Sequence, residues 1–240
     1  MKISIAVIVF LSSLLPSNLL AQSSTNTCEE AAYFILVLEK YHYEPQHLND
    51  QLSERIYKNF IQLLDPVGFY FTQKDIDTLS SFKFEIDDQI KNNTCDFLTL
   101  ASELYYKQLL LVDSAIVSIL SDPFDLTVDE EFKKPVASDS NYASNTIELV
   151  KRWETWLKYL MVDDVAEQIY LQQMTRERID SVLSHESELR FELKDGIIKR
   201  HKRRLKTLEV YDNFIFSHFM DAIATSFDPH TKYFSTREKE

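Results

Sequence analysis

The residues with catalytic potential in this sequence are not spaced as catalytic sites require. A nucleophilic serine usually stands on a glycine-flanked turn, but the chain has only 2 glycines and no Gly-Xaa-Ser-Xaa-Gly pattern. It also lacks the His-Glu-Xaa-Xaa-His pattern of zinc proteases and the glycine-rich loops that bind nucleotides. Six histidines are scattered along it: His42, His47, His185, His201, His218 and His230. Metal sites need clustered ligands, so we predict no metal, no cofactor and no catalytic residue in this chain.

Residues 199–204 form a basic cluster in an otherwise acidic chain. Such a cluster can be a docking patch for an anionic partner or for phospholipid headgroups. The favoured interpretation is a solvated helix face whose cations pair with the many acids of the chain. The candidate patch consists of Lys199, Arg200, Lys202, Arg203 and Arg204.

The two cysteines, Cys28 and Cys95, allow two interpretations. In an oxidising compartment they can form a disulfide across the start of the fold. The alternative is two independent buried thiols, because sequence spacing does not show whether the two Cα atoms lie within bonding distance.

Other titratable residues have ordinary structural explanations. Asp87-Asp88 and Asp163-Asp164 are adjacent pairs. Neighbours on a helix point about 100° apart, so we interpret both pairs as surface charge rather than as acid–base sites. His218 lies on an apolar helical face, which predicts a hydrogen-bonded core histidine.

The amino-acid composition indicates which kind of fold positions these residues and which partners it excludes. The chain of 240 residues is 45% hydrophobic and 12% aromatic, enough for a buried core. Two glycines in this length favour long helices with few sharp turns. The formal net charge of −12 repels phosphate backbones, so we predict no nucleic-acid partner.

Hydrophobic periodicity predicts one all-α domain of seven or eight helices, followed by an extended C-terminal junction segment. Asn49 is predicted to cap one helix, and Thr72 opens another with Asp75 in a capping-box position. The predicted helices span about 29–43, 49–64, 72–90, 96–120, 147–161, 165–183, 188–208 and 211–227.

Residues 1–21 have the order of a secretory signal peptide: a lysine, an apolar run, and small residues before a cleavage point near Ala21. The alternative is an uncleaved anchor helix, but the apolar run is short and Pro16 interrupts it. We therefore expect an exported protein with no transmembrane span in the mature chain. The predicted division is a signal peptide at 1–21, a helical domain at 22–227 and the junction at 228–240.

The C-terminal motif resembles a family junction. Its residues are Asp228, Pro229, His230, Thr231, Tyr233, Phe234 and Ser235. They are similar to the segment of tail-specific (C-terminal processing) serine proteases where the helical N-terminal domain leads into a PDZ domain. Asp-Pro ends the preceding helix. We expect Tyr233 and Phe234 to pack back onto the helical body, the alternative being frayed ends.

Two further segments agree with this resemblance, which covers about residues 41–240. One is Leu64-Asp65-Pro66 with Tyr70-Phe71-Thr72; the other is the stretch 122–127 with the helix containing Trp153. Thr236 departs from the family, which usually has proline there. The family's PDZ domain and Ser–Lys catalytic core would follow Glu240, so we expect a module without them, as a truncated product or a stand-alone remnant.

The resemblance implies a periplasmic scaffold that encloses protein substrates beside a PDZ–protease module, and that can dock a helical lipoprotein adaptor. It assigns no catalytic residue to this chain. The alternative, from another functional class, is a stand-alone helical binding or adaptor protein for exported partners. A PDZ-plus-protease reading frame beyond Glu240 would distinguish the two.

Overall fold

The computed structural model describes residues 18–126, 128, 131–134, 141–171, 186–211 and 213–234. Over these residues the chain forms eight helices and no strand, which confirms the all-α prediction. The helices are α1 (Asn18–Tyr41), α2 (Asp50–Leu64), α3 (Gln73–Ser80), α4 (Ile86–Lys91), α5 (Asp96–Ile119), α6 (Thr146–Leu171), α8 (Glu186–Tyr211) and α9 (Asn213–Phe227). Within the same residues, no helix is both long and apolar enough to cross a membrane.

Both predicted helix caps are present. The Asn49 side chain accepts a hydrogen bond from the Leu52 amide at 3.1 Å and begins α2. Thr72 and Asp75 form a reciprocal capping box at the start of α3. These caps give the orphan amides of the first turn an acceptor, so the sequence alone fixes where both helices begin.

Several predicted helix boundaries were wrong. The helix predicted over 29–43 begins at Asn18 instead, as part of α1. The helix predicted over 72–90 is interrupted, because α3 ends at Ser80 and α4 begins only at Ile86. The Ser80 and Ser81 hydroxyls donate to the carbonyls of Asp77 and Thr78 at 2.7 and 2.8 Å, a local alternative to helix that favours a turn.

Farther along the chain, α6 runs without a break through the separation predicted between residues 161 and 165. The rest of the helix predicted at 165–183, residues 172–183, lies outside the described residues.

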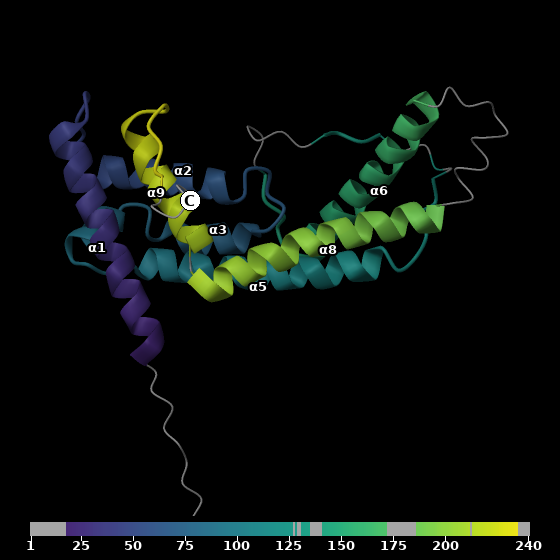
Figure 1. Cartoon of the computed structure of the whole chain (residues 1–240), viewed down its shortest axis with the longest axis horizontal. Coiled ribbons are helices and arrows are strands. Elements are labelled where there is room, and N and C mark those ends of the chain that lie inside the picture. Colours follow the sequence, from purple (N-terminus) through teal and green to yellow (C-terminus); the bar gives the residue numbers. More distant parts are fainter. Residues whose placement is uncertain are drawn as a thin grey trace, which may run out of the picture.

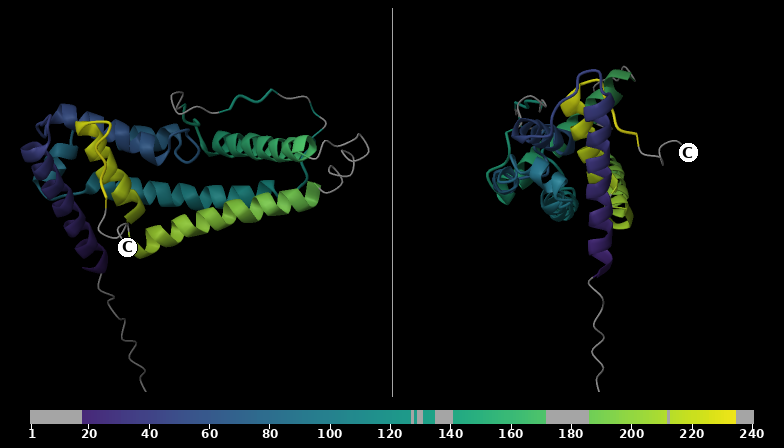
Figure 2. Two further views of the ribbon diagram at one scale, coloured as in Figure 1. Left: turned by 45° about the horizontal axis from the view of Figure 1, so that its top comes forward. Right: turned by 90° about the vertical axis from the view of Figure 1, so that its left-hand side faces the viewer.

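The molecule is elongated, and its two ends are built differently (Figure 1). At one end α1, α2, α3, α4 and α9 gather around the start of α5, with α9 packed along α2; we call this the junction half. The rest of α5 lies beside α8 and carries α6, and these three form the arm half (Figure 2, left).

Each half has its own core. α5 contributes Tyr105 and Leu109 to the core of the junction half, and Val112 and Ile116 to that of the arm half. The helices are therefore organised along α5, whose length sets the spacing between the two cores.

Candidate functional site

The C-terminal junction begins with a tight turn after α9. Asp228 accepts hydrogen bonds at its Oδ2 from the His230 amide at 3.1 Å and the Thr231 hydroxyl at 3.2 Å. The Thr231 amide also donates to the Asp228 carbonyl at 3.0 Å. This Asp-based turn ends the helix as the Asp-Pro sequence predicts and redirects the chain across the surface of the junction half.

The two residues that follow α1 hold this turn in place. His42 Nε2 is hydrogen-bonded to Thr231 Oγ1 at 3.1 Å, and the Tyr43 hydroxyl donates to Asp228 Oδ1 at 3.4 Å. The His42 ring also packs edge-on against Phe227, with 5.8 Å between the centroids. The charge of Asp228 raises the pKa of Tyr43.

Tyr233 is the main anchor of the outgoing segment. Its amide donates to Asp221 Oδ1 on α9 at 3.1 Å, and its hydroxyl donates to Glu30 Oε1 on α1 at 2.6 Å. Its ring meets Phe34 edge-on at a centroid distance of 5.4 Å and faces Phe216 at 6.4 Å. Tyr233 therefore joins the first and last helices of the domain.

The expectation that Phe234 packs in the same way is wrong, since this residue is 66% exposed. In an extended segment successive side chains point to opposite faces, so docking Tyr233 turns Phe234 outward. Pro229 and His230 are exposed as well, and Ser235 lies outside the described residues.

A buried turn after α2 lies between the two halves, in the segment that sequence analysis singled out only by its family resemblance. Asp65 is 1% exposed and accepts three backbone amides, from Phe69 at 2.8 Å, Tyr70 at 3.0 Å and Phe71 at 2.8 Å. Burial raises the pKa of Asp65, and the three amides and the charge of Arg152 oppose that rise. The turn sends Phe71 into one core and Phe69 into the other.

α6 binds the same turn from the arm half. Arg152 donates to the Gly68 carbonyl at 2.6 Å, and the Trp153 indole donates to the Phe69 carbonyl at 2.6 Å. Gly68 has a φ of +69°, and an added Cβ would lie 2.8 Å from Arg152 Nη1. The positive φ favours glycine here, and a side chain would also have to displace the Arg152 guanidinium.

A buried polar network joins α8 to the same seam. The His201 ring bonds Asp113 through Nδ1 and Tyr70 through Nε2, the latter at 3.3 Å. Arg204 donates to the hydroxyls of Tyr70 at 2.7 Å and Tyr105 at 3.5 Å. Burial lowers the pKa of His201, and Asp113 opposes that shift. An Asp–His–Tyr arrangement invites comparison with a catalytic triad, but the His201 side chain is 4% exposed and has no room for a substrate.

The predicted docking patch is therefore divided. Arg204 is turned inward and also lies over the Tyr70 ring at 5.6 Å, so its assignment to a surface patch is wrong. Lys199 is exposed and pairs with Asp195 at 2.6 Å, as the solvated-face interpretation expects. Arg200, Lys202 and Arg203 are exposed along α8, and a docking role for them stays a prediction. The inward residues recur at positions 197, 201 and 204, a helical period that the continuous run of cations obscures.

Cys28 and Cys95 are joined in the structure, with 6.0 Å between their Cα atoms. The link connects α1 to the residue before α5, inside the junction half.

His218 was predicted to be a hydrogen-bonded histidine on an apolar helical face. It is half-buried and hydrogen-bonded to the Phe214 carbonyl at 2.7 Å, in agreement with that prediction. Among the described residues, no three His, Cys, Asp or Glu side chains gather as metal ligands would.

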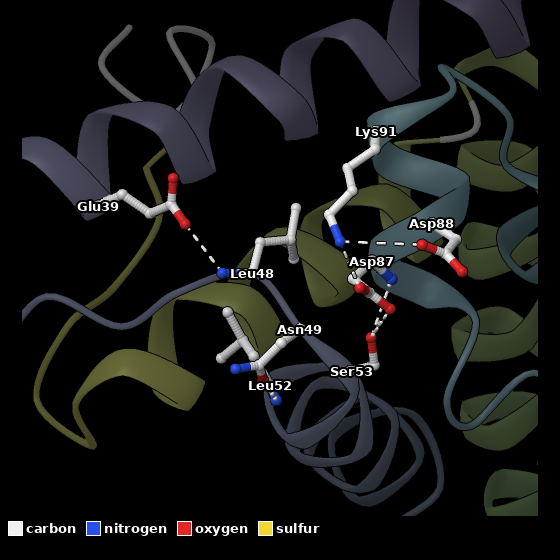
Figure 3. Close-up of polar contacts among 8 residues, drawn as sticks. All are labelled: Glu39, Leu48, Asn49, Leu52, Ser53, Asp87, Asp88 and Lys91. Carbon is white, nitrogen blue, oxygen red and sulfur yellow. Dashed lines mark hydrogen bonds and ion pairs between the residues drawn. The ribbon is translucent and has the colours of Figure 1, made fainter.

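The Asp87-Asp88 pair does not behave as one surface feature (Figure 3). Asp87 is 2% exposed, accepts from the Ser53 hydroxyl at 2.7 Å and pairs with Lys91 at 2.6 Å, so its assignment to surface charge is wrong. Asp88 is 70% exposed, as predicted. Their 100° separation on the helix places one carboxylate inside and the other in water. Asp163 and Asp164 are both exposed on α6.

With this geometry in place, the chain can be compared with known families. The model of the tail specific protease N-terminal domain matches residues 34–237. The matched region starts within α1 and includes both the Asp65 turn and the anchored junction.

Proposed function

The chain belongs to the family of tail specific protease N-terminal domains, and on that premise we propose that it is the helical scaffold of such a protease. In this proposal the domain fixes the direction in which the chain leaves α9 and forms part of the wall around protein substrates. The working compartment is the periplasm, reached by export through residues 1–21. Peptide-bond chemistry is assigned to a PDZ–protease module and to no residue of this chain.

One observation supports this proposal most directly. The short segment from Asp228 to Tyr233 is bonded to Glu30 of α1, to His42 and Tyr43 just after α1, and to Asp221 of α9. A flexible connection needs no such anchoring, whereas a connection that aims a following domain does. Holding parts in a productive geometry is a recognised contribution to catalysis even where no chemistry takes place.

A chimeric enzyme tests the proposal. The PDZ and protease domains of a tail-specific protease are fused after residue 235, and cleavage of an unfolded protein with an apolar C-terminus is measured. We expect the chimera to cleave, and the His42→Ala/Tyr233→Ala double variant to lose about tenfold or more in rate, because misplacement of a site costs on that order. Phe234→Ala is the matched control and should stay within about twofold.

Equal rates for the double variant and the parent, with both proteins folded, would refute the positioning role. This chain alone should leave the same substrate intact. Cleavage that persists through repurification and disappears with a single substitution in this chain would refute the assignment of catalysis to another module.

A second candidate, a helical binding protein or adaptor for exported partners, is favoured by the exposed apolar residues of α1. Tyr33, Leu36 and Tyr41 are 71%, 61% and 70% exposed. Large apolar side chains left in water can mark a protein-binding surface. Binding of unfolded protein by this chain alone, lost on replacing Tyr33 and Leu36 by serine, would favour this function.

A further inference from the structure

A surface pocket of about 330 Å³ lies on the arm half, away from the junction. It is bounded by the turn after α2, by residues 131–134 and by one face of α6. Its volume is within the range of small-molecule sites, roughly 300–1,000 Å³.

Aromatic side chains from three separate segments line the pocket. Trp156 of α6 lies 5.8 Å from Phe69 and 5.8 Å from Phe132, measured between ring centroids. Phe132 is itself stacked on Tyr159 at 4.1 Å, which holds it against α6. These rings form an apolar lining suited to a flat or aliphatic group of a ligand.

The charged residues around this lining are mostly cations. Among the described residues, Arg152, Lys133 and Lys134 line the pocket together with one acid, Glu131. This local excess of positive charge occurs in a chain with a net charge of −12. An aromatic lining by itself favours cationic ligands, but three neighbouring cations repel them. The charge balance therefore selects an anion.

Arg152 is held ready for such a contact. Its Nη1 donates to the Gly68 carbonyl at 2.6 Å, which fixes the guanidinium at the edge of the pocket. A guanidinium has five N–H donors, so this bond leaves others for a ligand. Carboxylates match the planar donor geometry of arginine particularly well.

We propose that this pocket binds a carboxylate with an aromatic or aliphatic body, the ring lying against Trp156 and the carboxylate facing Arg152 and Lys134. The ligand is either a free small carboxylate or the carboxylate end of a peptide. This inference does not depend on the proposed scaffold role, because the pocket lies on the arm half and uses none of the junction residues.

Calorimetric titration of the full chain with three matched probes tests the charge requirement. The probes are N-acetyl-L-phenylalanine, its C-terminal amide and phenyltrimethylammonium. We expect the acid to bind at least about fivefold more tightly than the amide, and the cation not to bind, because Arg152 and Lys134 attract the added negative charge and repel a cation. Equal binding of acid and amide, or tighter binding of the cation, would overturn the proposal.

Variants locate the site and separate binding from folding. Lys134→Gln should weaken binding of the acid about two- to fivefold, as expected for one exposed ion pair. Lys151→Gln removes an exposed cation of α6 that does not line the pocket, and it should change nothing. Trp156→Leu should weaken binding about tenfold by removing the aromatic surface. If acid binding is unchanged in both pocket variants, the ligand is bound elsewhere and the proposal fails.

A comparison of 3-phenylpropionate with a pentapeptide ending in free phenylalanine identifies the source. Tighter binding of the peptide assigns the pocket to chain ends, and equal or weaker binding assigns it to free carboxylates. Both results support the carboxylate class, and failure of both compounds to bind contradicts it.

Discussion

The junction half and the arm half are both helical, but they use polar side chains differently. In the junction half, hydrogen bonds connect segments that are far apart in sequence: His42 and Thr231 are separated by 189 residues, and Glu30 and Tyr233 by 203. In the arm half, long-range bonds join α6 and α8 to the Asp65 turn and to Tyr70, and Arg152 also borders a pocket together with Lys134.

The two halves also differ in the size of their cores. The junction half has the larger core and its own covalent link, Cys28–Cys95. The arm half has a smaller core shared by α5, α6 and α8. They meet at the Asp65 turn, which is bonded from both sides. Variants that affect one half, or the seam between them, therefore test whether this division is real.

The largest effect is expected at the seam. Asp65→Ala leaves three buried amides without their acceptor and should lower the free energy of unfolding by about 3–5 kcal/mol. Urea denaturation measures the loss, and hydrogen exchange should show reduced protection in both halves. Asp77→Ala, an exposed acid on α3, is the control and should stay within about 0.5 kcal/mol of the parent. Loss of protection in only one half would contradict the role of Asp65 as the shared support.

Replacing both Cys28 and Cys95 by serine should affect the junction half selectively. The link closes a loop of 67 residues, so its removal should cost about 2–4 kcal/mol by freeing the unfolded chain. Non-reducing mass analysis first establishes that the parent contains the disulfide. Exchange protection should then fall in α1 and α5 more than in α6; an equal fall in α6 would show that the two halves unfold as one.

Variants of two adjacent aromatic residues test whether the junction is anchored to the helices. Tyr233→Ala should lower the free energy of unfolding by about 2 kcal/mol, because a packed ring and a hydrogen-bonded hydroxyl are lost. Phe234→Ala removes a ring that is 66% exposed and should cost less than about 0.5 kcal/mol. Equal melting midpoints for the two variants would mean that the junction is not anchored as described.

The smallest effect concerns pH in the junction half. Burial raises the pKa of Asp87, but hydrogen bonds from Lys91 and Ser53 outweigh it, and the pKa lies below its ordinary value. The ionised form is therefore favoured by folding, so its contribution is complete above the unfolded pKa of about 3.9 and is lost as pH falls through the lower folded pKa.

Asp87→Asn should thus destabilise the protein by about 0.5–1 kcal/mol at pH 6, and the difference from the parent should shrink toward pH 2.5. Asp88→Asn changes an acid that is 70% exposed and should show little of this dependence. A difference that grows as pH falls would contradict the assignment.

Sequence reasoning succeeded where a local signal decides the structure. Asn49, Thr72 and Asp75 satisfy amides only a few residues away, so their capping roles follow from spacing. The Asp-Pro turn at residue 228 and the apolar period of α9 are local in the same sense. These signals were enough for the helical fold and for the family resemblance.

Long-range contacts were not predictable in this way. Arg204 and Lys199 belong to one basic run, yet Arg204 is bonded to the Tyr70 hydroxyl whereas Lys199 is exposed to water. Asp87 and Asp88 differ for the same reason. Which side of a charged helix is buried depends on where a neighbouring helix packs, and the neighbours here come from distant parts of the chain.

The sequence by itself thus determined the helices, most of their ends and the family, because hydrophobic period, caps and turn residues act over a few positions. The tertiary structure alone decided that Tyr233 is anchored while Phe234 is exposed, that Asp65 supports both halves, and that Arg152, Lys134 and Trp156 border one pocket. Each of these depends on packing between elements that are tens of residues apart or more, and no short stretch of sequence contains that information.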